Sequence, residues 1–132
     1  MAVKAGTIVG VTHVYRNFTG IGSLNMAFVA VNFPAYTATT DSFSIAGVGA
    51  AIETFSKRGK TNTLKSAFVV APGKDSAGTA CYPTDTTVAG ALTVSTDALT
   101  GGLKAANLST EVTMTTGGTV TPATIAVVYS EA

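Results

Sequence analysis

Residues 26–33, Met-Ala-Phe-Val-Ala-Val-Asn-Phe, decide the fold class, because apolar side chains occupy both faces of what would be an extended segment. Val29, Val31 and Phe33 share one face, and the residues between them share the other. A strand with two apolar faces is typical of a central strand that is covered on both sides. Pro34 has no backbone N–H and should end this strand. We therefore expect a mainly β protein built around it.

The two-residue period recurs on both sides of this stretch and predicts further strands. In the first of them we expect Val11 to share a face with His13 and Tyr15. In a later one we expect Leu64 to share a face with Phe68. The predicted segments are residues 7–15, 36–46, 64–70, 87–96, 110–116 and 119–130, and the last should place Ile125, Val127 and Tyr129 on one face.

Glycine and proline predict where the strands stop. Residues 72–78 follow an Ala-Pro-Gly sequence and should form a loop. The pair Gly101 and Gly102 argues for a loop within the ambiguous segment 97–107. The Gly-Gly pair at 117–118 should form a hairpin turn, because two glycines tolerate the positive φ that tight hairpins need.

One segment follows a helical period instead. Residues 48–58 predict a single short helix, with Gly59 as its stop and with Lys57 and Arg58 placed where cations favour the helix dipole. Its apolar face would consist of Val48, Ala51, Ile52 and Phe55. Short strands separated by turns, plus one helix, predict an antiparallel β-sandwich or jelly-roll-like domain.

Length and composition suit one β-rich domain over residues 1–132, with 46% hydrophobic and 11% charged residues. The formal net charge is +1, so no global field draws the chain to nucleic acid or to lipid. No apolar run is long enough to span a bilayer, and the first ten residues lack the features of a signal peptide. We therefore expect neither nucleic acid nor a membrane as a partner. Low charge with abundant Gly, Ala and Thr favours a chain that hides surface in an assembly.

The sequence predicts neither an enzyme nor a cofactor. His13 is the only histidine and Cys81 the only cysteine, and the alternatives are a reactive pair or two structural residues, of which we favour the second. Residues 58–61, Arg-Gly-Lys-Thr, end like a phosphate-binding loop, but position 54 is threonine and a helix precedes them. Scattered carboxylates leave only a loop-bound calcium ion as a metal alternative.

Half of the basic residues lie within nine positions and form one candidate contact patch: Lys57, Arg58, Lys60 and Lys65. The plainest interpretation is a solvated helix end. A second is a contact patch for a carboxylate-bearing protein, and a third is nucleic acid, which the lack of interleaved aromatic residues disfavours. Tyr36, Tyr82 and Tyr129 are candidate stacking faces for sugar or protein, although its strand places Tyr129 in the core.

The order of several motifs resembles that of head decoration (cement) proteins of tailed bacteriophages. The motifs are VNFPAYT at 31–37, TDSFSI at 40–45, GVGAAIE at 47–53, RGKTNTL at 58–64 and ATIAVVY at 123–129. The resemblance covers roughly residues 29–70 and 119–130. It implies a non-enzymatic β domain on the outside of a capsid, often a trimer that binds the major capsid protein and stabilises the shell. Such a protein is made in the bacterial cytoplasm and located on the virion.

Other functions remain open at this point. The main alternative is a carbohydrate- or receptor-binding β module of a phage tail fibre or an adhesin, followed by a pilus subunit and a small hydrolase. We also expect that a terminus or the loop at 72–86 adds to a neighbour's sheet edge, because few charges protect the predicted strands.

Overall fold

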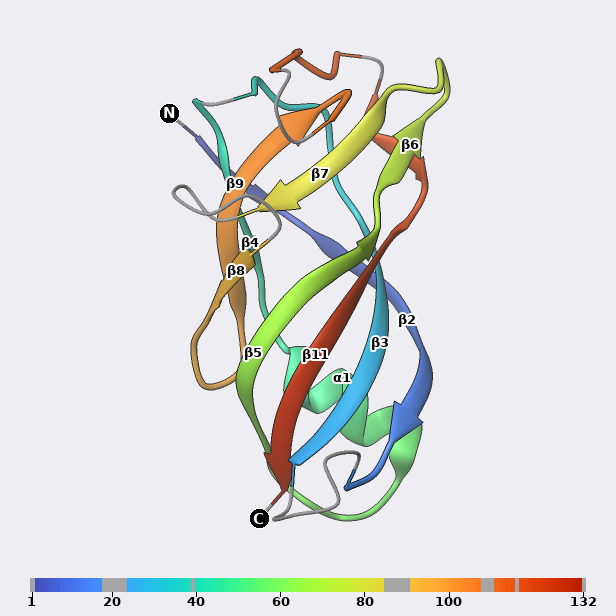
Figure 1. The fold of residues 1–132 in the computed structure, drawn as a ribbon, viewed down its shortest axis with the longest axis vertical. Helices are drawn as coiled ribbons and strands as arrows, with labels where there is room; N and C mark the ends of the chain where they lie inside the picture. Colours follow the sequence, from blue (N-terminus) through green and yellow to red (C-terminus); the bar gives the residue numbers. More distant parts are fainter. Residues whose placement is uncertain are drawn as a thin grey trace.

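The protein is described by a computed structural model that covers residues 2–17, 24–38, 40–84, 91–107, 111–115 and 117–131. It is mainly β, as the sequence predicted: of the described residues, 60% are in strands and 8% are in the helix. Within the described residues one helix, α1 (Val48–Ser56), lies between β4 and β5 in chain order (Figure 1). The strands are β1 (Val3–Ala5), β2 (Thr7–Tyr15), β3 (Leu24–Asn32), β4 (Ser42–Ile45), β5 (Asn62–Ala71), β6 (Gly73–Asp75), β7 (Ala80–Thr84), β8 (Ala91–Val94), β9 (Leu99–Ala105), β10 (Thr119–Thr121) and β11 (Ala123–Glu131).

The strands form two connected sheets in a sandwich-like arrangement. The first sheet has the order β2–β3–β11–β5–β8, and the second has the order β10–β6–β7–β9–β4–β1. Strand β8 joins them, because it pairs with β5 and also with β9. Among the described strands, all pairings are antiparallel except that of β1 with β4.

The core lies between the inner face of the first sheet, the second sheet and α1. Phe33, which follows β3, packs its ring edge-on against Phe43 of β4, with centroids 5.3 Å apart. The predicted inward face of β11 is confirmed, including Tyr129 as a core residue. The largest fully buried side chains are Val29, Val31, Phe43, Ile45, Val48, Ile52, Leu99, Leu103, Met114, Ile125, Val127 and Tyr129.

Strand β3 is central, as its sequence predicted, and lies between β11 and β2. Val29 and Val31 on its inner face are fully buried. The opposite face was expected to be covered too, and this expectation is wrong. Met26 and Phe28 there are only half-buried, because no described element packs over them.

Helix α1 is confirmed two residues shorter than the predicted span of 48–58. Lys57 ends it in the left-handed conformation at φ 56°, and its N–H donates to the Glu53 carbonyl, so the predicted stop at Gly59 comes too late. Ile52 is buried as expected. Phe55 is not, because it lies in a shallow hollow beside Val11 of β2 rather than in the core, and 48% of it is exposed.

The ambiguous segment 97–107 contains strand β9, in which Gly101 and Gly102, the pair that argued for a loop, are paired residues. A Cβ at Gly101 would collide with the Thr84 carbonyl and lie 2.9 Å from the Phe43 ring. Glycine therefore serves close packing at this position, not a turn.

The segment 110–116 was expected to be a strand, and its described part, 111–115, is not. Only Met114 pairs, through an isolated bridge to Tyr36 in which each N–H donates to the other carbonyl, at 2.9 and 3.0 Å. Gly117 and Gly118 do have positive φ, but the chain leaves them into β10, which pairs with β6. Pro122 separates β10 from β11, so the strand expected at 119–130 is divided.

Residues 72–78, expected to be a loop, contain β6 and the turn of a β6–β7 hairpin. Asp75 holds this turn, because its Oδ1 accepts the N–H of Ala77 at 3.0 Å and of Thr79 at 2.7 Å. Residues 85–86 of the proposed edge-adding segment lie outside the described residues. In the part of the chain that is described, no helix has the length and apolar character needed to cross a membrane.

Candidate interaction surface

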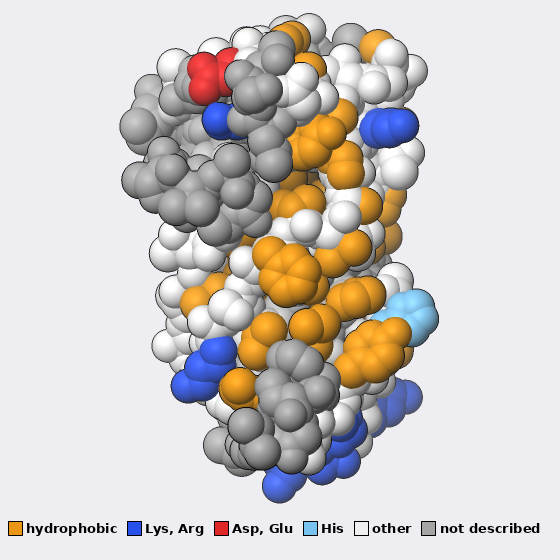
Figure 2. Space-filling model, in the orientation of Figure 1, with side chains coloured by type: hydrophobic (Ala, Val, Ile, Leu, Met, Phe, Trp, Pro, Cys, Tyr) orange, Lys and Arg blue, Asp and Glu red, His pale blue; other side chains and the backbone are white. Residues whose placement is uncertain are grey.

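The surface that stands out is the face of the first sheet that is turned away from α1 (Figure 1). Cross-strand register places two neighbouring rows of side chains there, each crossing β2, β3, β11 and β5 in turn. Figure 2 shows a band of hydrophobic side chains over these strands. We call this surface the outer face and define it by the two rows Tyr15–Met26–Val128–Ser66 and His13–Phe28–Ala126–Phe68.

The outer face is apolar, contiguous and partly open to solvent. Tyr15 is 49% exposed and Phe68 is 43% exposed. Ala126 of β11 is fully buried between Phe28 of β3 and Phe68 of β5. The rings of His13, Tyr15 and Phe28 contact one another, with centroids 5.7 to 6.2 Å apart. Neither row contains a Lys, Arg, Asp or Glu side chain. Contiguous apolar surface of this kind marks an interaction site, whereas isolated exposed residues do not.

β-Bulges decide which side chains reach the outer face. In β2 the register shifts between Val11 and His13, so Val11 packs against the core while His13 lies outside. In β5 a shift at Lys65 places Leu64 inside and Phe68 outside. Each bulge adds one residue and reverses the alternation after it. The predicted groupings of Val11 with His13, and of Leu64 with Phe68, are therefore wrong.

The predicted basic patch borders the outer face. Lys57, Arg58 and Lys60 lie in the connection from α1 to β5, and Lys65 is the bulge residue next to Ser66. Arg16 joins them because it follows Tyr15 at the end of β2, and sequence reasoning missed it because it is distant along the chain. Figure 2 shows blue side chains gathered at the lower end of the molecule. We call this set the basic end: Arg16, Lys57, Arg58, Lys60 and Lys65.

Two carboxylates lie at the basic end, and both bind groups of the chain itself. The two terminal nitrogens of Arg16 donate to the two carboxylate oxygens of Glu131, at 2.7 and 2.8 Å. Arg58 Nε donates to the same carboxylate at 2.9 Å. The hydrogen bond from Arg16 is the main cause that lowers the pKa of Glu131. Glu53 accepts the backbone N–H groups of Gly59 and Lys60, at 2.6 and 3.2 Å. Neither carboxylate is within ion-pair distance of a lysine side chain in the described residues.

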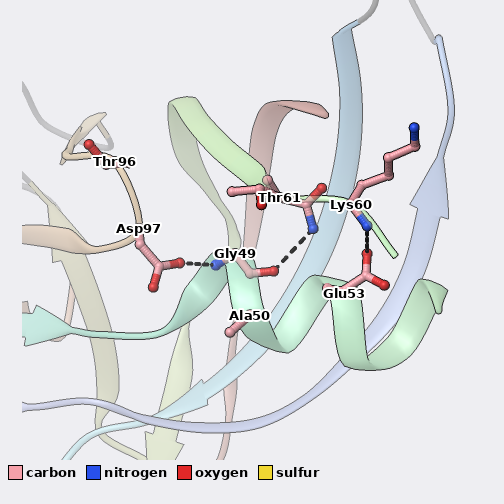
Figure 3. A pocket seen from close by; sticks show the side chains of 8 residues that line it. Gly49, Ala50, Glu53, Lys60, Thr61, Thr96 and Asp97 are labelled. Atoms are coloured by element: carbon pink, nitrogen blue, oxygen red, sulfur yellow. Dashed lines mark hydrogen bonds between the residues drawn. The ribbon is translucent and has the colours of Figure 1, made fainter. Parts of the chain in front are cut away.

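A hollow of about 400 Å³ lies at the start of α1 (Figure 3). Asp97, from the β8–β9 turn, accepts the N–H of Gly49 and so caps a helix that has no side-chain cap of its own. Asn62 donates to the Gly49 carbonyl at 3.1 Å, and Glu53 holds the Lys60 backbone. The polar groups that line this hollow thus fix the helix and the connection after it.

The structure separates the two residues considered for nucleophilic catalysis. His13 lies on the outer face in β2, whereas Cys81 is buried in β7 of the second sheet. Burial raises the pKa of Cys81 to about 11. Its neighbour Tyr36 is also buried and donates to the Lys104 carbonyl at 2.6 Å, so Tyr36, like Tyr129, is not a stacking face. Within the described ranges, no three potential metal ligands gather at one point.

No family model, curated protein or solved structure matches this chain. The resemblance to phage decoration proteins therefore stays a prediction.

Proposed function

We propose that this chain is a non-enzymatic structural protein that enters a larger assembly by packing its outer face against another protein. One observation carries the proposal: two adjacent rows of mostly apolar side chains cross four strands, contain no charged residue and include exposed rings at Tyr15 and Phe68. Such a surface contributes nothing to the stability of a free chain in water. A partner that covers it contributes about 25 cal/mol of favourable free energy for each Å² of apolar area buried.

The motif order favours one form of this function, a decoration protein on the outside of a phage head. The partner would then be the major capsid protein, and the chain would be a trimer on the virion surface. Low charge supports this form, because many copies side by side repel one another little at a net charge of +1. Repetition over a shell also multiplies weak contacts into firm attachment.

The test compares two exposed phenylalanines. Phe68→Ser removes the exposed ring at the β5 end of the outer face, and Phe55→Ser removes a similarly exposed ring from α1, on the other side of the first sheet. We expect purified wild-type protein to bind viral shells assembled without it, and Phe68→Ser to bind at least about tenfold more weakly, a loss typical of an aromatic residue that anchors an interface. Phe55→Ser should bind as wild type does, and both variants should unfold at wild-type denaturant concentrations.

The shell-binding measurement is paired with native mass over a concentration series. A trimer in the wild type supports the decoration role. Absence of binding to shells, together with a monomer at every concentration, would overturn it. Equal loss of binding in Phe68→Ser and Phe55→Ser would show that the outer face is not the contact surface.

One observation favours a second function, a carbohydrate- or receptor-binding module. The rings of His13 and Tyr15 are nearly parallel, with an interplanar angle of 8°, and Tyr15 is half exposed. Sugar rings bind to open aromatic faces of this kind by stacking. Binding to a glycan library that Tyr15→Ala abolishes, with no binding to shells, would favour this function over the first.

A further inference from the structure

The basic end concentrates charge on a chain that is nearly neutral as a whole. It holds five of the eight Lys and Arg residues and two of the seven Asp and Glu residues, which gives it a formal charge of +3 on a chain whose total is +1. The rest of the chain is consequently slightly acidic. This asymmetry is invisible in the net charge, but a partner that approaches the lower end of the molecule would meet it.

The positive charge at this end is not cancelled internally. Glu131 is shared by two guanidinium groups, and Glu53 is occupied by backbone N–H groups. Lys57, Lys60 and Lys65 are exposed, and no described carboxylate lies within 4.0 Å of their side-chain nitrogens. These ammonium groups are therefore available to an external anion.

The pair of arginines also shows what kind of anion fits. Arg16 binds the Glu131 carboxylate with two donors, and Arg58 adds a third through Nε. Arg58 is 39% exposed in its side chain, so the terminal nitrogens of its guanidinium group stay near the surface. A planar guanidinium fork matches a carboxylate in geometry as well as charge.

The basic end continues directly from the outer face. Arg16 follows Tyr15, and Lys65 precedes Ser66, so two cations stand at opposite ends of the row Tyr15–Met26–Val128–Ser66. A partner that covers this row must bring its own border against these cations. Charge complementarity then requires carboxylates on that border.

We infer that the outer face and the basic end form one docking surface for a protein whose apolar contact strip is bordered by Asp or Glu side chains. The inference rests on the proposed function, because it names the chemistry of the partner on the same surface. A protein is favoured over a nucleic acid because the cations all belong to the basic end, at the lower end of the molecule, and the outer face itself carries no charged side chain. A nucleic acid strand that crossed this face would leave most of its phosphates unpaired.

The experiment removes two charges at each end of the molecule. Lys60→Gln/Lys65→Gln lowers the formal charge of the basic end by two, and Lys4→Gln/Lys74→Gln removes the same charge from β1 and β6 of the second sheet. Binding to shells that lack this protein is measured at 50 mM and 500 mM NaCl. We expect the first variant to bind about fivefold to tenfold more weakly at low salt and about equally at high salt, where exposed charges are screened.

The control variant should bind within about twofold of wild type under both conditions, since its charges lie away from the contact. Equal effects of the two variants, or no effect of either, would overturn the inference. A loss caused by Phe68→Ser without any salt dependence would leave the proposed function standing and reject the acidic border.

If wild-type protein does not bind shells, a second measurement tests carboxylate recognition separately from the proposed decoration function. Poly-L-glutamate and single-stranded poly(dT) of equal charge are then titrated against the protein. Preference for poly-L-glutamate, lost in Lys60→Gln/Lys65→Gln and kept in the control variant, supports carboxylate recognition without the capsid. Preference for poly(dT) that Tyr15→Ser removes would overturn the inference in favour of nucleic acid.

Discussion

The two faces of the first sheet are both apolar, yet only one of them is used by the fold. The inner face, with Val29, Val31, Ile125 and Val127, is fully buried under α1 and the second sheet. The outer face of the same strands stays half open, with Phe68 exposed at its β5 end. Both faces have the hydrophobic side chains of a core, but only the inner face has a partner within the described chain.

This difference shows that the apolar residues of a strand indicate which of its faces will be covered. They do not indicate which element or molecule covers that face. A sequence pattern cannot distinguish a second layer of the same chain from another molecule. Stability measurements can, because side chains that are covered only in an assembly should contribute little to the folding of the free protein.

The largest expected effect separates the two faces within β11. Ile125→Ala removes a fully buried side chain of the inner face and should lower the free energy of unfolding by about 3 kcal/mol. Val128→Ala, three residues further along on the outer face, should lower it by about 1 kcal/mol or less, because this side chain is already partly solvated. Urea unfolding of both variants checks this. Similar losses would mean that the outer face is as important for folding as the inner one.

A smaller effect compares two glycines, one covered and one open. Gly101→Ala should destabilise the protein by about 2 kcal/mol, because the new Cβ collides with the Thr84 carbonyl. Gly10→Ala in β2 adds a Cβ where nothing lies within 4 Å, and should be neutral or stabilise by about 0.5 kcal/mol. Thermal unfolding measures both. A destabilised Gly10→Ala variant would mean that this edge of the first sheet is covered.

The pH dependence of stability tests the basic end. The pKa of Glu131 is lowered in the folded protein, chiefly by the hydrogen bond from Arg16, so this group stabilises the fold fully above its unfolded pKa of about 4.3. The stabilisation is lost as the pH falls through the lower, folded pKa.

Glu131→Gln should therefore be less stable than wild type at pH 7 and approach it as the pH falls through the folded pKa of Glu131, as urea unfolding over a pH series would show. Asp41, whose pKa is lowered by the Thr37 N–H, provides the control. Asp41→Asn should leave the contribution of Glu131 unchanged. A constant difference between wild type and Glu131→Gln at every pH would contradict this origin.

The smallest expected effect concerns Tyr129 of the inner face. Its ring is fully buried, and its hydroxyl has no hydrogen-bond partner in the described structure. Tyr129→Phe removes a polar group that gains nothing from burial, so stability should stay the same or rise by up to about 1 kcal/mol. A clear loss in urea unfolding would reveal a partner for this hydroxyl.

Strands with a strong period of two could be predicted from the sequence. The bounds of β2 were predicted, and those of β3 nearly so, because several large apolar residues alternate in each. The C-terminal end of β11 was predicted to within one residue, but its start was placed four residues too early, because the expected strand is divided at Pro122. Helix α1 was predicted to within two residues of its end for the equivalent reason, a helical spacing of Val48 and Ile52. In these elements local pattern and tertiary packing agree.

Features that depend on contacts between distant residues could not be predicted. Strand β9 was missed because a glycine pair looks locally like a turn. The reason for glycine at position 101 is the close approach of the Thr84 carbonyl, which is distant in sequence. The bulges in β2 and β5 leave no clear mark in the residues around them, so the outward direction of His13 and Phe68 was missed as well.

The candidate surface was predictable only in part, for a related reason. The lysines of the basic end are close in sequence and were found together, but Arg16 joins them through folding alone. The part of the outer face on β3 was interpreted as covered, because Phe28 has the apolar character of a buried residue and nothing local shows that no described element packs over it.

The place of β11 in the first sheet has a consequence for biosynthesis. This strand lies between β3 and β5, although about fifty residues separate it from β5 along the chain. At about 5–20 residues per second, a ribosome needs several seconds to supply it after β5 has emerged. During that time β3 and β5 each lack a neighbour, and their apolar side chains are exposed to solvent. The nascent chain should therefore depend on chaperones far more than its modest length suggests.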